Sequence, residues 1–264
     1  MQILCFKIKG KLAHFRKYYA NNTALSFTIP PRTTLMGMVA AVMGWPRDGY
    51  YEKLSSDNFS FGIRVITTLK KNFHRVNFLS IKTTGDLSKK LSSDFRGEGG
   101  RIQTPFEIVS GLNLTKDEVA YQVFIKSNGT SDILFDEIKN QFQTNNPIFN
   151  ITLGTANFTA SIYDVEVIDS THNGKSNDFI LMDSAIPSSM VEKLEFKKDE
   201  SNCYNFIEED LMSGEFIANG NREVKKMNRL IFSTTNIPLR VKLKEGYYRI
   251  ESKGEALNIQ FMDA

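Results

Sequence analysis

The sequence predicts an α+β protein in which strands outnumber helices. Three observations lead to this prediction. The N-terminal residues alternate apolar and basic side chains with a period of two, which is typical of a strand with one buried face. Two later segments carry apolar residues at helical spacing. Together with the other apolar stretches, they follow the order strand, helix, strand, strand, helix, strand. The length of 264 residues allows one large domain or two small ones.

Residues 2–9 form the first expected strand. Its two faces carry Leu4, Phe6 and Ile8 on one side and Lys7, Lys9 and Lys11 on the other. Residues 14–29 have no clean period and contain the sequence ANNT, so we expect a long loop there.

A helix is expected after the sequence IPPRTT, because the two prolines end the extended segment. Thr33 or Thr34 is the expected N-cap, and the helix should run to Met43 with Gly44 closing it. Four small residues form a stripe that would let this helix lie close on a sheet; they are Gly37, Ala40, Ala41 and Gly44.

The remaining elements complete the predicted core. Strands are expected at 58–68, 73–82, 119–126 and 157–168, and an amphipathic helix at 131–142 with Ser131 as its N-cap. Without the 73–82 strand, which belongs to the insertion at 69–118, the order is βαββαβ, typical of a ferredoxin-like, RRM-like domain.

Two domains are therefore expected. Residues 1–170 would form the ferredoxin-like domain, and its insertion at 69–118, which is rich in glycine and basic residues, is expected to be a protruding hairpin. A floppy surface loop is the alternative for that insertion. Residues 171–264 would form a small β-rich subdomain, with strands expected at 224–235, 237–243, 246–251 and 256–262.

The net charge of +3 conceals an asymmetry along the chain. Residues 1–101 hold 17 Lys and Arg against 6 Asp and Glu, a net charge of +11, and the remaining residues have a net charge of −8. A basic half of this size favours a polyanionic partner such as nucleic acid. The alternative is that the basic half neutralises the acidic half within the fold.

A basic and aromatic cluster gives the strongest functional signal. Residues 15–45 contain no acidic residue, and Asp48 is the first carboxylate of the chain. Single-stranded nucleic acid is bound by cations along its backbone and by aromatic rings that stack on bases. Both kinds of side chain occur within the four residues Arg16, Lys17, Tyr18 and Tyr19. Packing of the two tyrosines beneath the surface is the alternative.

The start of the first helix is a second candidate contact, because free N–H groups and the helix dipole attract phosphate. Arg32, Thr33 and Thr34 stand there. In the glycine-rich insertion, the candidate contacts are Arg75, Lys89, Lys90, Arg96, Arg101 and Gln103.

No motif for a catalytic metal or a nucleotide is present. The three histidines, His14, His74 and His172, form no HxH or HExxH motif, and GEGGR lacks the Lys-Ser/Thr of a phosphate-binding loop. We expect no metal and no cofactor. A metal-free ribonuclease could use His74 with Lys71, or else His14, as its catalytic residues. A binding or packing role is the favoured interpretation of each.

Cysteine usage and hydropathy suggest the compartment. Cys5 and Cys203 are far apart and are expected to be buried thiols in a reducing environment. No apolar run is long enough to span a membrane, and the N-terminus lacks the pattern of a signal peptide. We therefore expect a cytoplasmic protein without membrane contact.

Three stretches resemble a known family. The segment AHFRKYYANNTALSFTIPPRTTLMGMVAAVMG resembles the N-terminal signature of the CRISPR-associated Cas family five. RIQTPFEIV at 101–109 and PIFNITLGTANFTASI at 147–162 are similar to two further family motifs. The resemblance covers residues 1 to about 168 and is greatest to type I-B systems.

The resemblance implies a thumb hairpin, which corresponds to the insertion at about 83–110, and a structural role without catalysis. Proteins of this family hold the 5′ handle of the guide crRNA in type I Cascade complexes, contact the backbone and large subunits, and meet target DNA only indirectly. One branch of the family instead cuts precursor crRNA with a tyrosine, a lysine and a histidine. Here the nearest arrangement is Lys71 and His74 in KNFH, which departs from the adjacent pair of that branch.

Three hypotheses therefore stand. The first is a non-catalytic crRNA-binding subunit of a Cascade ribonucleoprotein in antiviral defence. The second is a metal-independent endoribonuclease that processes precursor crRNA. The third is a basic scaffold protein that meets an acidic partner.

Overall fold

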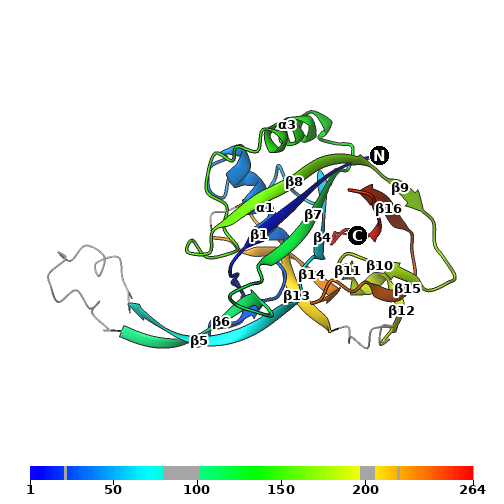
Figure 1. Ribbon diagram of the computed structural model, residues 1–264. Coiled ribbons are helices and arrows are strands. Elements are labelled where there is room, and N and C mark those ends of the chain that lie inside the picture. The colour runs from blue at the N-terminus through cyan, green and yellow to red at the C-terminus, as the bar shows by residue number, and fades with distance from the viewer. Residues whose placement is uncertain (21–22, 80–100, 197–205, 219–220, 264) are drawn as a thin grey trace.

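The computed structural model describes the chain except for residues 21–22, 80–100, 197–205, 219–220 and 264 (Figure 1). Strands predominate in the described part, and its two α-helices are α1 (Arg32–Met43) and α3 (Asp132–Gln143). The strands of the first part of the chain are β1 (Gln2–Gly10), β2 (Phe15–Arg16), β3 (Ser26–Phe27), β4 (Phe59–Val65), β5 (Leu69–Leu79), β6 (Arg101–Gly111), β7 (Val119–Ser127) and β8 (Ala160–Asp169).

Short strands and one 3₁₀ helix make up the second part. They are β9 (Thr171–Asn173), β10 (Ile180–Met182), β11 (Ile186–Pro187), η1 (Ser188–Met190), β12 (Val191–Glu195), β13 (Ile207–Phe216), β14 (Val224–Ser233), β15 (Leu239–Leu243), β16 (Tyr247–Ser252) and β17 (Glu255–Ile259). The sequence pattern predicted β14 to β17 and missed β13, because Glu and Asp interrupt its apolar residues.

A four-stranded antiparallel sheet forms the centre of the molecule. Its order is β4-β7-β1-β8, so β1 lies between two strands from distant parts of the sequence. Leu4, for example, is paired with Ile125 of β7 and Val167 of β8. The elements expected at 2–9, 58–68, 119–126 and 157–168 are all present as strands.

Both helices pack on one face of this sheet. Leu4, Phe6 and Ile8 point to that face and join Val39 and Ile138 in the largest apolar cluster of the described residues. The alternation of apolar residues in β1 therefore marks a buried face, as its period predicted.

The opposite face of the sheet is covered as well. Ile3 and Cys5 of β1 pack against Ile250 of β16 and Leu257 of β17, so the first half of β1 is buried on both sides. Two of the three lysines expected on this face are held by carboxylates: Lys7 pairs with Asp164 at 2.9 Å and Lys9 with Glu118 at 2.8 Å. Lys11 follows the end of β1 and donates to the backbone carbonyl of Asp117 at 3.1 Å. Three layers result, with helices, sheet and the β16–β17 hairpin in succession (Figure 1).

The insertion forms a long hairpin of β5 and β6, which projects from the body of the molecule (Figure 1). Its base is anchored on the far edge of β6. Ala13 exchanges two hydrogen bonds with Val109, and Ala24 pairs with the backbone of Pro105 and Glu107. The predicted strand at 73–82 coincides with β5 over residues 73–79. Of the thumb expected at about 83–110, residues 101–110 belong to β6, and residues 83–100 lie outside the described residues.

The second part of the chain shares its core with the first. Met212 of β13 and Phe232 of β14 belong to the same apolar cluster as the helices. The backbone N–H of Met262 donates to the carbonyl of Phe61, which extends the β4 edge of the sheet. The proposed domain boundary near residue 170 stays a prediction.

No helix among the described residues is long and apolar enough to cross a membrane.

The C-terminal end of α1 agrees with the sequence prediction, and its N-terminal end does not. Gly44 is in the left-handed conformation with a φ of 70°, as its role as C-cap predicted. The N-cap is Pro31 rather than Thr33 or Thr34, and Thr34 N–H and Leu35 N–H both donate to its carbonyl. The expected N-cap of α3, Ser131, occupies that position without a side-chain capping bond.

Candidate nucleic-acid interface

An open groove of about 570 Å³ lies beside the N-terminal half of α1. Six segments line it: residues 14–16, α1 with the residue before it, the Tyr50–Tyr51 pair, Phe78 and Phe106 of the β5–β6 hairpin, the loop 150–155, and β13 with the residues that follow it. Its volume is within the ~300–1,000 Å³ typical of sites that hold small molecules. The groove therefore has room for a nucleotide-sized segment.

Small residues of α1 form the floor of the groove. Thr34, Gly37 and Ala41 follow one another at helical spacing and line it. Of the small residues expected to pack on the sheet, Ala40 is buried in the core and Ala41 packs partly against it, whereas Gly37 is half-buried at the groove. The hydroxyl oxygen of Tyr50 lies 3.2 Å from the position that a Cβ of residue 37 would take. Gly37 thus allows Tyr50 to approach the helix.

The loop 150–155 is held against the start of β2. His14 N–H donates to the carbonyl of Leu153 at 2.9 Å. Gly154 has a φ of 98°, and a Cβ there would lie 1.8 Å from the carbonyl oxygen of His14. Only glycine fits both requirements, which explains the Leu-Gly pair within the motif at 147–162.

Aromatic side chains line much of the groove. Phe78 and Phe106 come from the hairpin, Tyr50 and Tyr51 from the segment after α1, and Phe216 from β13. His14 stacks on Phe106, with ring centroids 4.0 Å apart and planes inclined by 26°. Flat, apolar faces of this kind are suited to stacking on nucleobases.

The charge of the groove has one sign. Arg16 and Arg222 line it, and none of the described residues that line it is acidic. Arg16 is exposed, and its guanidinium donates to the carbonyl of Ala20 at 3.2 Å. The predicted role of Arg16 as a phosphate contact is compatible with this position.

Lys17 differs from its predicted role. Its ammonium binds both carboxylate oxygens of Asp210 on β13, at 2.9 and 3.0 Å, and its side chain is 12% exposed. Although burial lowers the pKa of Lys17, the hydrogen bonds to Asp210 and Tyr19 outweigh it and raise that pKa. The prediction that Lys17 contacts phosphate is corrected: its charge is neutralised within the fold.

Tyr18 and Tyr19 are exposed by 54% and 52%. Their rings meet edge to face at 5.1 Å, and the ammonium of Lys17 lies 5.8 Å from the ring of Tyr19. The alternative that both tyrosines pack beneath the surface is therefore wrong. Whether they stack on bases stays a prediction.

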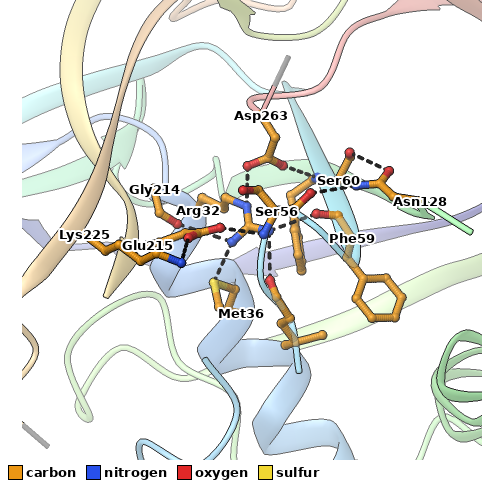
Figure 2. Close-up of polar contacts among 12 residues, drawn as sticks. Arg32, Met36, Ser56, Phe59, Ser60, Asn128, Gly214, Glu215, Lys225 and Asp263 are labelled. Carbon is orange, nitrogen blue, oxygen red and sulfur yellow. Dashed lines mark hydrogen bonds and ion pairs between the residues drawn. The ribbon is translucent and has the colours of Figure 1, made fainter. Parts of the chain in front are cut away.

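Arg32 is completely buried, which contradicts its predicted role as a phosphate contact. Figure 2 shows its guanidinium bound by Asp263 and by the carbonyl oxygen of Phe59, which accepts an N–H at 2.9 Å. The carbonyl oxygen of Leu54 accepts from the same nitrogen at 2.8 Å. A further N–H donates to the carbonyl of Gly214 at 3.3 Å. Arg32 thus ties α1 to β4, β13 and the last residues of the chain. Thr33 is similarly engaged, because its hydroxyl shares a hydrogen bond of 2.7 Å with Ser213.

Glu215 lies beside this cluster and carries the opposite charge (Figure 2). Its carboxylate accepts the N–H of Ser56 at 2.5 Å and pairs with Lys225 at 3.2 Å. Burial alone would raise the pKa of this carboxyl, but the hydrogen bonds from Ser56 and Lys225 lower it to about 2. The group is therefore ionised at neutral pH.

The thumb candidates are only partly described. Arg75 and Gln103 are exposed on β5 and β6 and belong to the same face of the hairpin, because Asn77 is paired with Gln103. Phe78 and Phe106, which line the groove, belong to the other face. Lys89, Lys90 and Arg96 lie outside the described residues, and only the backbone of Arg101 is described.

The predicted catalytic pair does not form in this structure. Lys71 and His74 are three residues apart on β5, so their side chains leave opposite faces of the strand. Lys71 pairs instead with Glu208 at 3.3 Å. His14 donates its Nδ1–H to the carbonyl of Glu107 at 2.7 Å, and burial lowers its pKa, so its ring is neutral at pH 7. Among the described residues, no His, Cys, Asp and Glu side chains gather as a metal site.

Several groove residues escaped the sequence analysis. Tyr50 and Tyr51 follow the first helix directly, and an aromatic pair next to a basic segment was an available signal. Ser213, Phe216 and Arg222 come from a region without a recognisable motif, and nothing in their local sequence points to the groove.

Comparison with known proteins identifies the family. Residues 3–178 match the family model described as CRISPR-associated protein (Cas_Cas5). The chain belongs to the CRISPR-associated Cas5 family. The resemblance of the three sequence motifs is thereby confirmed at the level of the family. No curated protein sequence matches the chain.

One solved structure shares the fold of this member of the Cas5 family, and two others are less similar. A crystal structure of a CRISPR protein from Archaeoglobus fulgidus matches with a TM-score of 0.57 and 14% identity, covering 98% of this chain and 99% of that one. A chain of a CRISPR RNA-guided surveillance complex has a TM-score of 0.46 at 12% identity, covering 92% and 91% of the two chains. A Cas protein crystal structure has a TM-score of 0.43 at 13% identity, covering 92% and 95%.

Proposed function

We propose that this member of the Cas5 family is a non-catalytic crRNA-binding subunit of a type I Cascade complex. It would cap the 5′ handle of the guide RNA next to the backbone and large subunits, in the cytoplasm, and meet target DNA only through the assembled complex. The motifs favour type I-B. Family membership gives the proposal its class, and the groove beside α1 carries it, because its lining within the described part of the chain combines arginines and aromatic rings and includes no acidic residue.

The proposed contacts follow from the position of each side chain. Arg16 would bind a backbone phosphate at the mouth of the groove, with the first turn of α1 near Thr34 adding its positive dipole end. Tyr18 and Tyr19 would stack on bases next to it. The β5–β6 hairpin would act as the thumb, with Arg75 and Gln103 on one face. The βαββαβ order and the sheet order β4-β7-β1-β8 support a ferredoxin-like core.

The experiment measures binding of labelled CRISPR repeat RNA to the purified chain by filter binding across a salt series. Arg16→Glu should weaken binding and flatten its salt dependence, because a phosphate contact is lost and a like charge is added. Tyr18→Ala with Tyr19→Ala should cost about 1–3 kcal/mol for each stacked base. Arg249→Glu is the control, since Arg249 is exposed on β16 and does not line the groove. Equal losses in the control and in Arg16→Glu would contradict the assignment, and an absence of RNA affinity would favour the basic-scaffold hypothesis.

One observation gives the endoribonuclease alternative a defined test. His14 lines the groove as a neutral ring whose Nδ1–H is held by a carbonyl, so its Nε2 has the protonation state of a general base. Incubation of repeat RNA with the protein and EDTA tests it directly. Specific cleavage that disappears in His14→Ala or His74→Ala would establish the alternative, and intact RNA would leave the non-catalytic role in place.

A further inference from the structure

The groove has a second cation that comes from beyond the region matched by the family. Arg222 follows β13, 44 residues after the end of the family match at residue 178. It lines the same groove as Arg16, together with Ser213 and Phe216. The second part of the chain, for which the sequence offered no function, therefore forms one wall of the groove.

A carboxylate holds Arg222 in place. Asp48 accepts its Nε–H at 3.1 Å and also accepts the hydroxyl of Tyr51 at 2.5 Å. The hydrogen bond from Tyr51, followed by that from Arg222, lowers the pKa of Asp48, so it is ionised at neutral pH. Tyr51 lines the groove, whereas Asp48 does not. The Asp48 carboxylate thus lies outside the groove and holds the side chains of Arg222 and Tyr51 in its wall.

The backbone at both residues is also constrained. Asp48 and Arg222 have φ values of 62° and 54°, in the left-handed region that non-glycine residues rarely occupy. The guanidinium carries four N–H donors besides the one bound by Asp48, and the side chain is 48% exposed. An arginine held through Nε and open to solvent is well suited to a phosphate, whose oxygens accept two N–H groups at once.

We propose that Arg222 is a phosphate-binding residue of the groove and that Asp48 is the residue that positions it. The groove would then hold single-stranded RNA between cations from the two parts of the chain, Arg16 and Arg222. This inference rests on the proposed RNA-binding function and names a contact that neither the basic N-terminal segment nor the thumb supplies.

The salt dependence of binding tests the role of Arg222. The probe is a fluorescein-labelled oligouridine, and anisotropy gives the affinity of the full chain at each salt concentration. Each lost phosphate contact on a single strand reduces the slope of log K against log salt by about 0.7. Arg222→Ala and Arg16→Ala should each show this reduction, and the double variant should lose about 1.4. Arg222→Lys should retain the slope while binding more weakly.

Arg47→Ala is the matched control, because Arg47 also pairs with Asp48, at 3.3 Å, but does not line the groove. Its slope should equal that of the wild type. If Arg222→Ala and Arg47→Ala are indistinguishable while the wild type binds, the inference is overturned and the proposed function stands. If the wild type does not bind oligouridine at low salt, the proposed function and the inference fail together.

Asp48→Asn tests the positioning role, because a charge effect and a positioning effect would change the RNA affinity in opposite directions. Removal of a negative charge near the groove should by itself strengthen RNA binding. Loss of positioning should weaken it, by about tenfold or more if the fork of Arg222 no longer meets the phosphate, without changing the slope attributed to Arg16. Tighter binding by Asp48→Asn would overturn the positioning role.

Discussion

The buried arginine at position 32 shows how a residue type can suggest the wrong role. A basic residue at a helix start favours phosphate binding, but Arg32 is surrounded by Asp263 and by backbone carbonyls. A buried cation requires such partners, because its desolvation costs several kcal/mol unless charges and hydrogen bonds compensate. Arg32 is consequently a structural residue, and the exposed Arg16 is the stronger candidate for RNA.

The second charged residue of this region, Glu215, predicts a pH dependence of stability. Its folded pKa of about 2 is below the ordinary value of 4.5. Its stabilising contribution is therefore complete above about pH 4.5 and is lost as the pH falls toward 2. Glu215→Gln should lose about 1.5–3 kcal/mol at pH 7, as expected for hydrogen bonds to a charged group.

Urea unfolding at several pH values measures this effect. The difference between the wild type and Glu215→Gln should shrink between about pH 4.5 and 2. Glu245→Gln is the control, because Glu245 is exposed and should change stability little. A difference that stays constant down to pH 2 would show that Glu215 stabilises the fold by packing and not by charge.

At the scale of elements, the groove depends on the close approach of the loop 150–155 to β2. Gly154 permits that approach, since a Cβ would meet the carbonyl of His14. Gly154→Ala should lower the free energy of unfolding by about 1–3 kcal/mol, because alanine is strained at this positive φ. The overlap of the new Cβ with the carbonyl of His14 should lower the free energy of unfolding further and displace His14 from the groove wall.

A second glycine separates these two effects. Gly129 has a φ of 89°, close to the 98° of Gly154, but no atom lies within 4 Å of its would-be Cβ. Gly129→Ala therefore carries the backbone cost without the collision. Thermal unfolding should show a clearly larger loss for Gly154→Ala, and equal losses would mean that the approach of the loop does not limit stability.

At the scale of the whole molecule, the charge asymmetry is partly resolved inside the fold. Lys7, Lys17 and Lys71 of the basic half pair with Asp164, Asp210 and Glu208 of the acidic half. The alternative that the two halves neutralise each other is therefore correct for these lysines. The groove is different, because its two arginines line a surface to which none of the described acidic residues contributes.

The pair of Arg32 and Asp263 joins distant parts of the chain and predicts cooperative unfolding. Arg32→Met or Asp263→Asn alone should lose about 3–5 kcal/mol, since each leaves a buried charge without its partner. The double variant should lose less than the sum of the two. Urea unfolding followed by circular dichroism and by tryptophan fluorescence measures both effects.

The same experiment tests the organisation into domains. Because residues 1–170 and 171–264 share an apolar cluster, the two probes should report one coincident transition in the wild type. Two separate transitions, or additive losses in the double variant, would contradict a coupling through Arg32 and Asp263.

The sequence by itself determined the local structure and the family. Apolar residues with a period of two or at helical spacing predicted all four strands of the central sheet and both helices, because these patterns depend on which face each residue presents. The glycine at position 44 indicated a left-handed C-cap, because few other residues adopt that conformation. The exact start of α1 was missed. Pro31, and not Thr33 or Thr34, occupies the N-cap position, and its carbonyl accepts the first N–H groups of the helix.

The tertiary structure alone decided which charges are available to a ligand. Whether a lysine or arginine is free depends on carboxylates far away in the sequence, as with Lys17 and Asp210 or Arg32 and Asp263. Arg222 and Asp48 are 174 residues apart and meet only because β13 folds beside α1. Local spacing carries no information about such contacts, which is the physical reason that the family was evident from the sequence and the groove was not.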